Sequence, residues 1–217
     1  MTGSSAPMFA PEGWPFILGG AAFTAAVGLL GPRWIPLTAL GLIFTLFSLW
    51  FFRNPVRTPP AGTGQIVSPA DGKVIYSGET PAGMYSPVGG RKVSIFMSPM
   101  DVHVNRAPVS GKVAAVRYNK GKFHVASVDK ASLSNEQNGV TIETPEGRKV
   151  TYVQIAGMVA RRIVCDVKEG DPVRQGQRVG MIRFGSRVDL YLPGDARIQV
   201  KPGDRVRAGE SVIGVFP

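Results

Sequence analysis

Two hydrophobic runs lie near the start of the chain, and a long stretch of alternating hydrophobic and polar residues follows them. The runs cover residues 16–31 and 34–52, contain no charged side chain and are separated only by Pro32 and Arg33. As a helix, the second run would reach about 28 Å, close to the hydrocarbon thickness of a bilayer. We therefore predict an N-terminal hydrophobic helical hairpin, within residues 1–57, that associates with a membrane.

The topology of this segment stays open at the level of sequence. The hairpin either spans the bilayer as a tight pair of helices or lies partly in one leaflet, and a buried hairpin of a soluble domain is the alternative. Arg53 and Arg57 follow the second run directly. By the positive-inside rule they place the C-terminal body on the cytoplasmic side of the inner cell membrane.

Short strands broken by Gly, Pro and Asp are predicted throughout residues 58–217. Six stretches alternate with the period of a strand: KVIYSG, KVSIFM, GKVAAVRY, GVTIET, KVTYVQIAG and RVDLYLP. Helical periodicity is scarce after residue 52. We therefore predict a mostly β body.

An internal repeat of the form V-K-x-G-D-x-V-R-x-G begins at Val167 and again at Val200, and its Gly-Asp pair predicts a turn with positive φ. A fainter pair is PADGKV at Pro69 and PVSGKV at Pro108. The pattern resembles the hammerhead repeats of lipoyl and biotinyl carrier domains. The modifiable lysine of those domains, which lies between small or methionine residues, has no counterpart here, so the resemblance concerns the fold alone.

The composition argues against several classes of protein. The net charge is +10, and the chain has one cysteine and two histidines, so we expect no intrachain disulfide and no metal site. A basic body suits nucleic acid or an anionic membrane surface. The basic residues are scattered and lack an aromatic stacking motif, and a hydrophobic hairpin precedes them. These features favour the membrane and argue against nucleic acid.

A Gly185-Ser186 pair lies between two predicted strands near the C-terminus. Such a pair is ordinarily a bulge or a turn. It also suits self-cleavage, in which the serine hydroxyl attacks the preceding glycine carbonyl, because glycine has no Cβ to obstruct the attack. β-Elimination from the resulting ester would leave dehydroalanine, and loss of ammonia would then give a pyruvoyl group.

A second candidate region is DVHVNR. On an extended segment the side chains of Asp101 and His103 would share one face, and Asn105 and Arg106 add polar neighbours. A lone histidine in a β protein is more often structural, but these polar neighbours favour a functional site at His103. His124 has no such neighbours, and we interpret it as structural or peripheral.

The ordered set of motifs resembles a known family. Two apolar segments ending in FFRNPVR, then SPADGKV, DVHVNRAPVSG and FGSRVDLYLP, are similar to the phosphatidylserine decarboxylase proenzyme of the short bacterial type, and Asn135-Glu136 also fits. The resemblance implies cleavage between Gly185 and Ser186 into a β chain, residues 1–185, and an α chain, residues 186–217. The two chains would remain a heterodimer in one folded unit, and further oligomerisation is left open.

The resemblance also implies the chemistry. Ser186 would become a covalent pyruvoyl cofactor that forms a Schiff base with phosphatidylserine and acts as the electron sink during decarboxylation to phosphatidylethanolamine and CO₂. His103 would supply the proton, and Asp71 matches the acidic position linked to self-processing. Longer family members have a second histidine where this chain has Arg106. An arginine cannot serve as general base, so Arg106 is a candidate contact for a carboxylate or phosphate of the substrate or for the oxyanion. Either His103 takes both duties, or self-cleavage relies mainly on strain and oxyanion stabilisation.

Two alternatives remain. One is the same chemistry on an archaetidylserine-type ether lipid, since nothing in the sequence distinguishes the hydrocarbon chains. The other, from a different class, is a membrane-anchored lipoyl-like adaptor of a transport complex. Such adaptors usually insert a long helical hairpin into the lipoyl module, and the sequence has no heptad stretch for one.

Removal of residues 1–52 should weaken membrane association while sparing the β body, because the predicted anchor holds the hydrophobic runs. Vesicle flotation of the truncated and full chains measures this, and circular dichroism checks that the strands persist. Undiminished vesicle binding would contradict the anchor.

Overall fold

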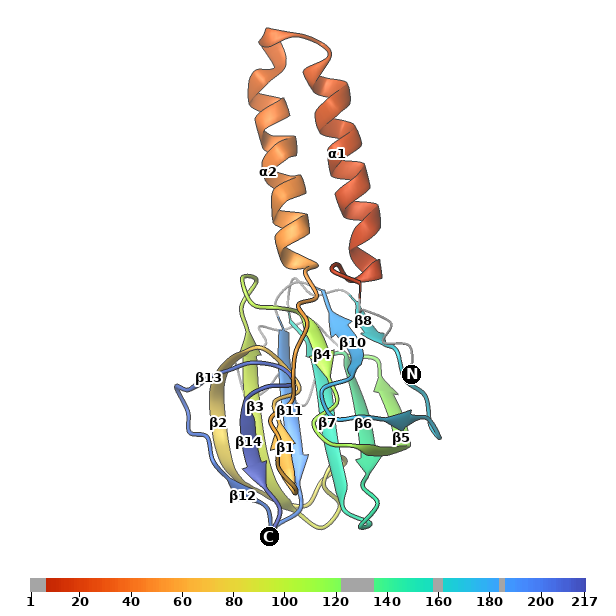
Figure 1. Ribbon diagram of the computed structural model, residues 1–217, viewed down its shortest axis with the longest axis vertical. Coiled ribbons are helices and arrows are strands. Elements are labelled where there is room, and N and C mark those ends of the chain that lie inside the picture. The colour runs from red at the N-terminus through yellow and green to blue at the C-terminus, as the bar shows by residue number, and fades with distance from the viewer. Residues whose placement is uncertain (1–6, 122–134, 158–161, 184–185) are drawn as a thin grey trace. The chain divides into compact units, whose positions relative to one another are not determined.

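The computed structural model describes residues 7–121, 135–157, 162–183 and 186–217 (Figure 1). The chain divides into two compact units, Met1–Val56 and Arg57–Pro217, one helical and one built of strands. The division falls one residue before the predicted boundary.

The helical unit is a hairpin of α1 (Trp14–Gly28) and α2 (Ile35–Phe51), each preceded by a short 3-10 helix, Pro11–Gly13 or Pro32–Trp34. Gly20 faces Thr45, and Gly41 faces Thr24: a Cβ on either glycine would lie 2.7 Å or 2.6 Å from the threonine hydroxyl of the other helix. Each of these threonines donates its hydroxyl to a carbonyl of its own helix at 2.8 Å. Small residues therefore let the two helices pack closely, as in membrane helix pairs.

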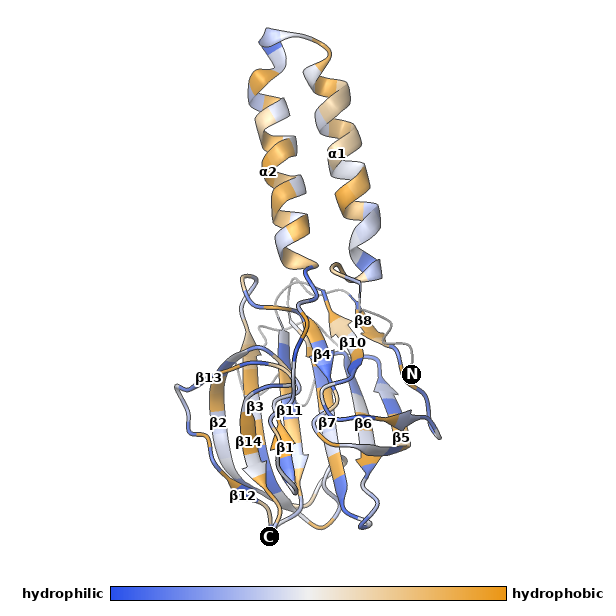
Figure 2. Cartoon of the chain, in the orientation of Figure 1, coloured by the Kyte–Doolittle hydropathy of each residue, from blue (hydrophilic) through white to orange (hydrophobic). Residues whose placement is uncertain are grey.

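Most residues of the hairpin are apolar, as the hydropathy colouring in Figure 2 shows. Large side chains such as Leu18, Leu40, Ile43 and Leu46 are more than half exposed. The stretch Pro32–Phe51 is long and apolar enough to cross a bilayer. α1, at 15 residues, is shorter than a full span.

The second unit is a curled assembly of strands, so the predicted mostly β body with a helical hairpin before it is confirmed (Figure 1). In chain order the strands are β1 (Gln65–Val67), β2 (Gly72–Thr80), β3 (Gly90–Met97), β4 (Val104–Arg106), β5 (Gly111–Asn119), β6 (Gln137–Glu143), β7 (Lys149–Ala156), β8 (Ile163–Cys165), β9 (Pro172–Val173), β10 (Arg178–Ile182), β11 (Ser186–Leu192), β12 (Arg197–Ile198), β13 (Arg205–Val206) and β14 (Val212–Val215).

The largest sheet has eight strands in the order β13-β2-β3-β11-β7-β6-β5-β9. Two three-stranded sheets, β1-β14-β12 and β4-β10-β8, complete the unit. All the pairings are antiparallel. Within the large sheet, β11 lies between β3 and β7 and is hydrogen-bonded along both edges.

The predicted repeat forms two equivalent turns. Gly170 and Gly203 have φ of 91° and 104°, and the carboxylates of Asp171 and Asp204 accept backbone N–H groups at 3.0 Å and 2.9 Å. Each turn then leads into a two-residue strand, β9 or β13, that covers an end of the large sheet. The Gly-Asp turns with positive φ are therefore confirmed.

Each copy of the fainter repeat forms a strand pairing with one copy of the stronger repeat. Gly111 of β5 pairs with Val173 in one half, and Gly72 of β2 pairs with Val206 in the other. A Cβ at either glycine would lie 2.2 Å from a carbonyl oxygen of the adjacent strand. Glycine is required at both places because a neighbouring backbone passes there, and each half of the body is thus built on the same plan.

The core lies on one face of the large sheet, where alternate side chains of its central strands point. It is formed by buried Val, Ile, Leu, Met and Ala side chains, among them Val93, Ile95, Val140, Val188 and Leu190. Alternation along β11 therefore directs Ser186, Val188 and Leu190 to the same face.

Candidate active site

Ser186 is the first residue of β11, the strand at the centre of the large sheet. It lies opposite Met97 of β3 and Ala156 of β7, and its side chain is fully buried. Its Oγ donates a hydrogen bond to the sulfur of Met97 at 3.3 Å. A thioether is a weak acceptor, so the hydroxyl is held without a strong partner at that sulfur.

A chain of three buried amides approaches the same sulfur. Asn138 Nδ2 donates to Gln154 Oε1 at 3.1 Å, and Gln154 Nε2 donates to Asn105 Oδ1 at 3.0 Å. The amide nitrogen of Asn105 then lies 3.9 Å from Met97 Sδ. Hydrogen bonds between amides therefore run from β6 through β7 to β4, and the last amide lies beside Met97, the residue opposite Ser186.

His103, just before β4, is fully buried. Its Nδ1 lies 2.9 Å from the backbone oxygen of Asp101, and a carbonyl oxygen can only accept. Nδ1 therefore carries the proton, and Nε2 is the basic nitrogen of the neutral ring. The backbone oxygen of His103 accepts from the N–H of Ile182 at 3.4 Å, which ties the residue to the strand that leads toward Ser186.

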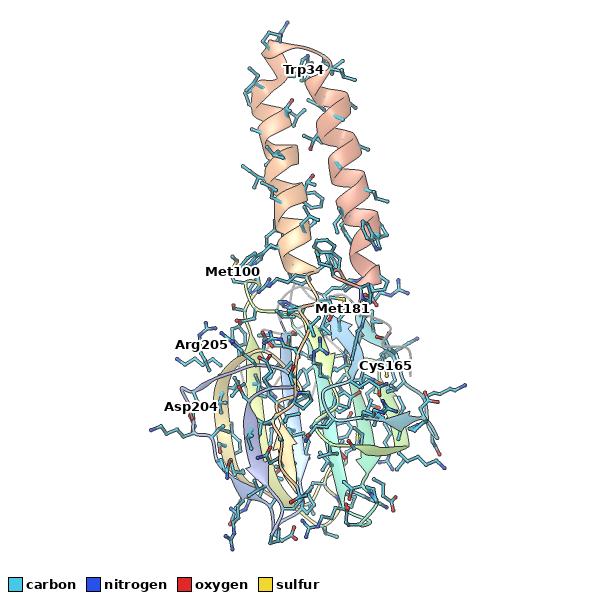
Figure 3. The ribbon with its side chains drawn as sticks, viewed as in Figure 1. Trp34, Met100, Cys165, Met181, Asp204 and Arg205 are labelled. Atoms are coloured by element: carbon cyan, nitrogen blue, oxygen red, sulfur yellow. The ribbon has the colours of Figure 1, made fainter. Side chains whose placement is uncertain are left out.

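The expectation that Asp101 and His103 lie on one extended segment is wrong. Asp101 is in a turn, where its N–H donates to Ser98 O at 2.9 Å and its carboxylate accepts the N–H of Ser98 at 2.8 Å. The carboxylate also pairs with Arg205 at 3.1 Å; Figure 3 labels this arginine beside Asp204 at the β13 turn. Asp101 thus orients the histidine ring through its backbone oxygen.

Asp71 and Arg106 belong to a second polar cluster. Arg57 binds Asp71 at 2.9 Å and Glu210 at 2.6 Å, and its side chain is only 9% exposed. The guanidinium of Arg106 donates to Gly176 O at 2.9 Å. Burial lowers the pKa of Arg106, the positive charge of Arg57 lowers it further, and the carboxylate of Asp71 opposes the shift.

The second contact of Asp71 is part of the repeat. Its carboxylate accepts the backbone N–H of Ala208 at 2.7 Å, and at the equivalent position of the other half Ser110 Oγ accepts the N–H of Gln175 at 2.9 Å. A serine and an aspartate therefore cap the same kind of turn. The negative charge, which Arg57 neutralises, is what distinguishes Asp71 from its counterpart.

The two clusters are joined through Pro69. Its backbone oxygen accepts the N–H of Arg106 at 3.0 Å and lies 3.4 Å from Asn105 Nδ2. The SPADG and DVHVNR motifs are thus brought together. Asn135, of the Asn135-Glu136 pair, donates to the backbone oxygen of Ala156 at 2.8 Å, and Ala156 lies opposite Ser186. Gly185 and His124 lie outside the described residues.

The opposite face of β11 carries a buried charge cluster. Arg187 and Asp189 are almost fully buried and form two contacts, at 2.9 Å and 3.1 Å. Lys92 of β3 adds a third contact to the same carboxylate at 3.1 Å. Charges that are buried in this way are stable only when paired, so the cluster fixes the residues that follow Ser186 in one register.

Met97, Gln154 and Arg57 were not expected at the site. The sequence alone could have indicated Gln154, because it occupies a core-facing position of the strand KVTYVQIAG between Tyr152 and Ala156. A polar residue at such a position indicates a buried hydrogen-bond network. Met97 has the pattern of an ordinary core residue, and Arg57 was interpreted only as a charge next to the membrane.

A fully buried serine hydroxyl at a strand start, a buried histidine tied to the preceding strand and a network of buried amides are together typical of an enzyme active site. Comparison with known proteins defines the enzyme further. Residues 44–214 match the phosphatidylserine decarboxylase family model. The chain is 49% identical over 208 residues to the phosphatidylserine decarboxylase proenzyme of Syntrophus aciditrophicus (95% of this chain, 97% of the relative).

Proteins with the same name from Syntrophotalea carbinolica and Geobacter metallireducens are 51% identical over 203 residues and 45% identical over 222 residues. These alignments cover 94% of both chains and 100% of both chains, respectively. The chain therefore belongs to the phosphatidylserine decarboxylase family and is a carboxy-lyase. This membership over nearly the full length argues against the transport adaptor.

Asp71→Asn should lower the free energy of unfolding by about 3 kcal/mol, because it leaves part of the buried Arg57 charge uncompensated. Urea denaturation of the full chain measures this. The matched control is Glu79→Gln, whose pair with Arg91 is exposed and should contribute less than about 1 kcal/mol. Equal losses for the two variants would contradict a structural role for the Arg57 pair.

Proposed function

We propose that this chain decarboxylates phosphatidylserine to phosphatidylethanolamine and CO₂ with a pyruvoyl group made from Ser186, after self-cleavage between Gly185 and Ser186. The relatives are named phosphatidylserine decarboxylase proenzymes, and this name, which gives both the substrate and a precursor form, supports the proposal. The products would be a β chain, residues 1–185, and an α chain, residues 186–217.

The observation that carries the proposal is the position of Ser186. Its side chain is fully buried, at the first residue of a strand that is paired on both edges. A break before Ser186 would leave those pairings intact, and the new terminus would stay inside the protein. Within the described part of the chain, the Ser186 hydroxyl donates to a thioether, a weak acceptor, and this suits a nucleophile.

The surroundings fit the group. A pyruvoyl unit has fewer non-hydrogen atoms than the serine it replaces, so it needs no added space between Met97 and Ala156. It is uncharged, which suits a fully buried position. When formed, the pyruvoyl group supplies an electron sink for the bond that breaks on loss of CO₂.

His103 holds the proton for this step. Its Nδ1–H is fixed on the backbone oxygen of Asp101, so Nε2 is the atom that gains and gives a proton. Arg106 is tied to Gly176 O within the Asp71 cluster, and a structural contribution to that cluster is its best supported role.

The helical hairpin anchors the enzyme to the inner cell membrane, with the basic body on the cytoplasmic side. Its exposed apolar residues and the spanning length of Pro32–Phe51 support the anchor. Residues 1–52 hold one acidic and one basic side chain, so the body carries the whole net charge of +10. An anionic lipid substrate is concentrated at such a surface.

Ser186→Ala should leave a single full-length chain without decarboxylase activity, because the nucleophile is removed. Denaturing electrophoresis and intact mass spectrometry measure the splitting, and the wild-type chain should yield a pyruvoyl-capped fragment 186–217. Ser94→Ala, at another buried serine, on β3, is the control and should still split. Two fragments from the Ser186 variant would contradict the cleavage site.

His103→Ala should still split but should decarboxylate phosphatidylserine about a hundredfold more slowly or worse, because the proton donor is lost. Product formation in mixed micelles measures the rate, and the KM should change less than kcat. Unchanged turnover of the processed variant would remove His103 from the mechanism. A variant that remains one chain would place His103 in self-cleavage instead.

A further inference from the structure

Two hydrogen-bond donors converge on one sulfur atom at the start of β11. Ser186 Oγ lies 3.3 Å from Met97 Sδ, and Asn105 Nδ2 lies 3.9 Å from the same atom. Both side chains are fully buried. The other contact of the Asn105 amide nitrogen, to Pro69 O, is long at 3.4 Å. Among the residues that the structure describes, this buried donor therefore has one weak acceptor, the sulfur, and one long contact, to the carbonyl oxygen.

The direction of this donor is fixed by its neighbours. Gln154 Nε2 lies 3.2 Å from the backbone oxygen of Val164, which can only accept, so this end of the Gln154 amide is the nitrogen. The same nitrogen donates to Asn105 Oδ1 at 3.0 Å, and Asn138 donates to the other end of the Gln154 amide. The oxygen of Asn105 must therefore face Gln154, and its NH₂ group must face the sulfur of Met97, to which Ser186 Oγ also donates.

We propose that Asn105 donates a hydrogen bond to Oγ of Ser186 when that oxygen becomes part of a leaving carboxylate, and so promotes the elimination that forms the pyruvoyl group. This rests on the proposed function. In this proposal Asn105 is the catalytic residue for the elimination step, because its amide would contact a reacting atom, Oγ of Ser186. Gln154 is a positioning residue, because it acts only through Asn105.

The chemistry has two stages that use Oγ differently. In the first, Oγ attacks the Gly185 carbonyl, the C–N bond breaks and its nitrogen takes up the proton, which gives an ester and a free amine. In the second, a base removes the Cα proton of residue 186, the Cβ–Oγ bond breaks, and its electrons leave with Oγ as the Gly185 carboxylate. Tautomerisation to an imine and hydrolysis by water then release ammonia.

Negative charge grows on Oγ during the second stage. The Asn105 N–H group is buried and held on the sulfur that Oγ also contacts, and a donor placed beside Oγ and shielded from water stabilises such charge with little reorganisation. In the first stage Oγ acts as the nucleophile, and a donor to it brings no comparable advantage. The geometry of Asn105 therefore points to elimination rather than to ester formation.

Asn105→Asp separates the two stages. Aspartate has the same shape and still accepts from Gln154, but an ionised carboxylate donates no hydrogen bond. We expect ester formation to continue and pyruvoyl formation to slow by at least about tenfold. Hydroxylamine reports the ester, because it splits the chain into a hydroxamate-ended β chain and a fragment 186–217 that begins with serine. Mass spectrometry distinguishes this fragment from the pyruvoyl-capped one.

The pH provides a readout that a purely structural role would not change. The carboxyl group introduced by Asn105→Asp can donate again once it is protonated, so pyruvoyl formation in this variant should recover, relative to wild type, as the pH falls toward about 5. Asn119→Asp is the matched control. The Asn119 amide also contacts a methionine sulfur, Met84 Sδ at 3.1 Å, but on β5, three strands from β11 in the sheet. It should process as wild type does at each pH.

Gln154→Glu tests the same inference without altering any atom of Asn105, and so covers the case in which the first variant does not fold. A glutamate oxygen in place of Nε2 draws the NH₂ group of Asn105 toward itself and away from Ser186. The variant should show the same hydroxylamine-sensitive ester and slow pyruvoyl formation.

Three results would overturn the role of Asn105: wild-type rates of pyruvoyl formation in both variants, full-length chains that resist hydroxylamine, or a defect of equal size in Asn119→Asp. A natively folded wild-type chain that never splits would instead overturn the proposed function, and this inference with it. The two failures are therefore distinguishable.

Discussion

The pairing of β11 on both edges is the constraint on which the candidate site depends. Ser186 begins this strand and lies opposite one residue of β3 and one of β7. The position of its backbone is therefore set by two neighbouring strands. The paired charges of Arg187 and Asp189 on the opposite face add a second restraint, because a shift by one residue would expose the buried ions to the apolar core.

The duplicated plan of the body explains how the site's two polar clusters form. Each half supplies a Gly-Asp turn, a short covering strand and a capped turn, and β11 lies between the halves. Asp71 and Ser110 are equivalent caps, so Asp71 has a structural role in the repeat. The segment between the two caps runs from β2 through His103, Asn105 and Arg106, and its Asn105 shares the sulfur of Met97 with Ser186.

Local patterns predicted much of the fold. Alternation identified the strand RVDLYLP, the repeat predicted the positive φ of Gly170 and Gly203, and the two apolar runs predicted the helical hairpin. The candidate site was predicted less completely. Ser186, His103 and Asp71 were named from motifs. The turn at Asp101 was missed because its hydrogen bonds to Ser98 compete with an extended backbone.

The chain of hydrogen-bonded amides that ends at Met97, opposite Ser186, could not be predicted from local sequence. Asn105, Asn138 and Gln154 lie on three different strands, and their contacts arise only when β4, β6 and β7 are assembled. The partner of Arg57 was missed for the same reason, since Glu210 lies far along the chain. Contacts between distant residues follow from topology rather than from composition or periodicity.

The interlacing of residues 186–217 with the remaining chain has a kinetic consequence. This segment contributes β11 to the centre and β13 to one end of the large sheet, and β12 and β14 to a second sheet. A chain broken before Ser186 could not release it without global unfolding. Refolding of a cleaved protein, however, would require two separate chains to meet. Refolding would therefore change from a first-order to a second-order reaction. The lifetime of the folded, cleaved protein would then depend on how slowly it unfolds.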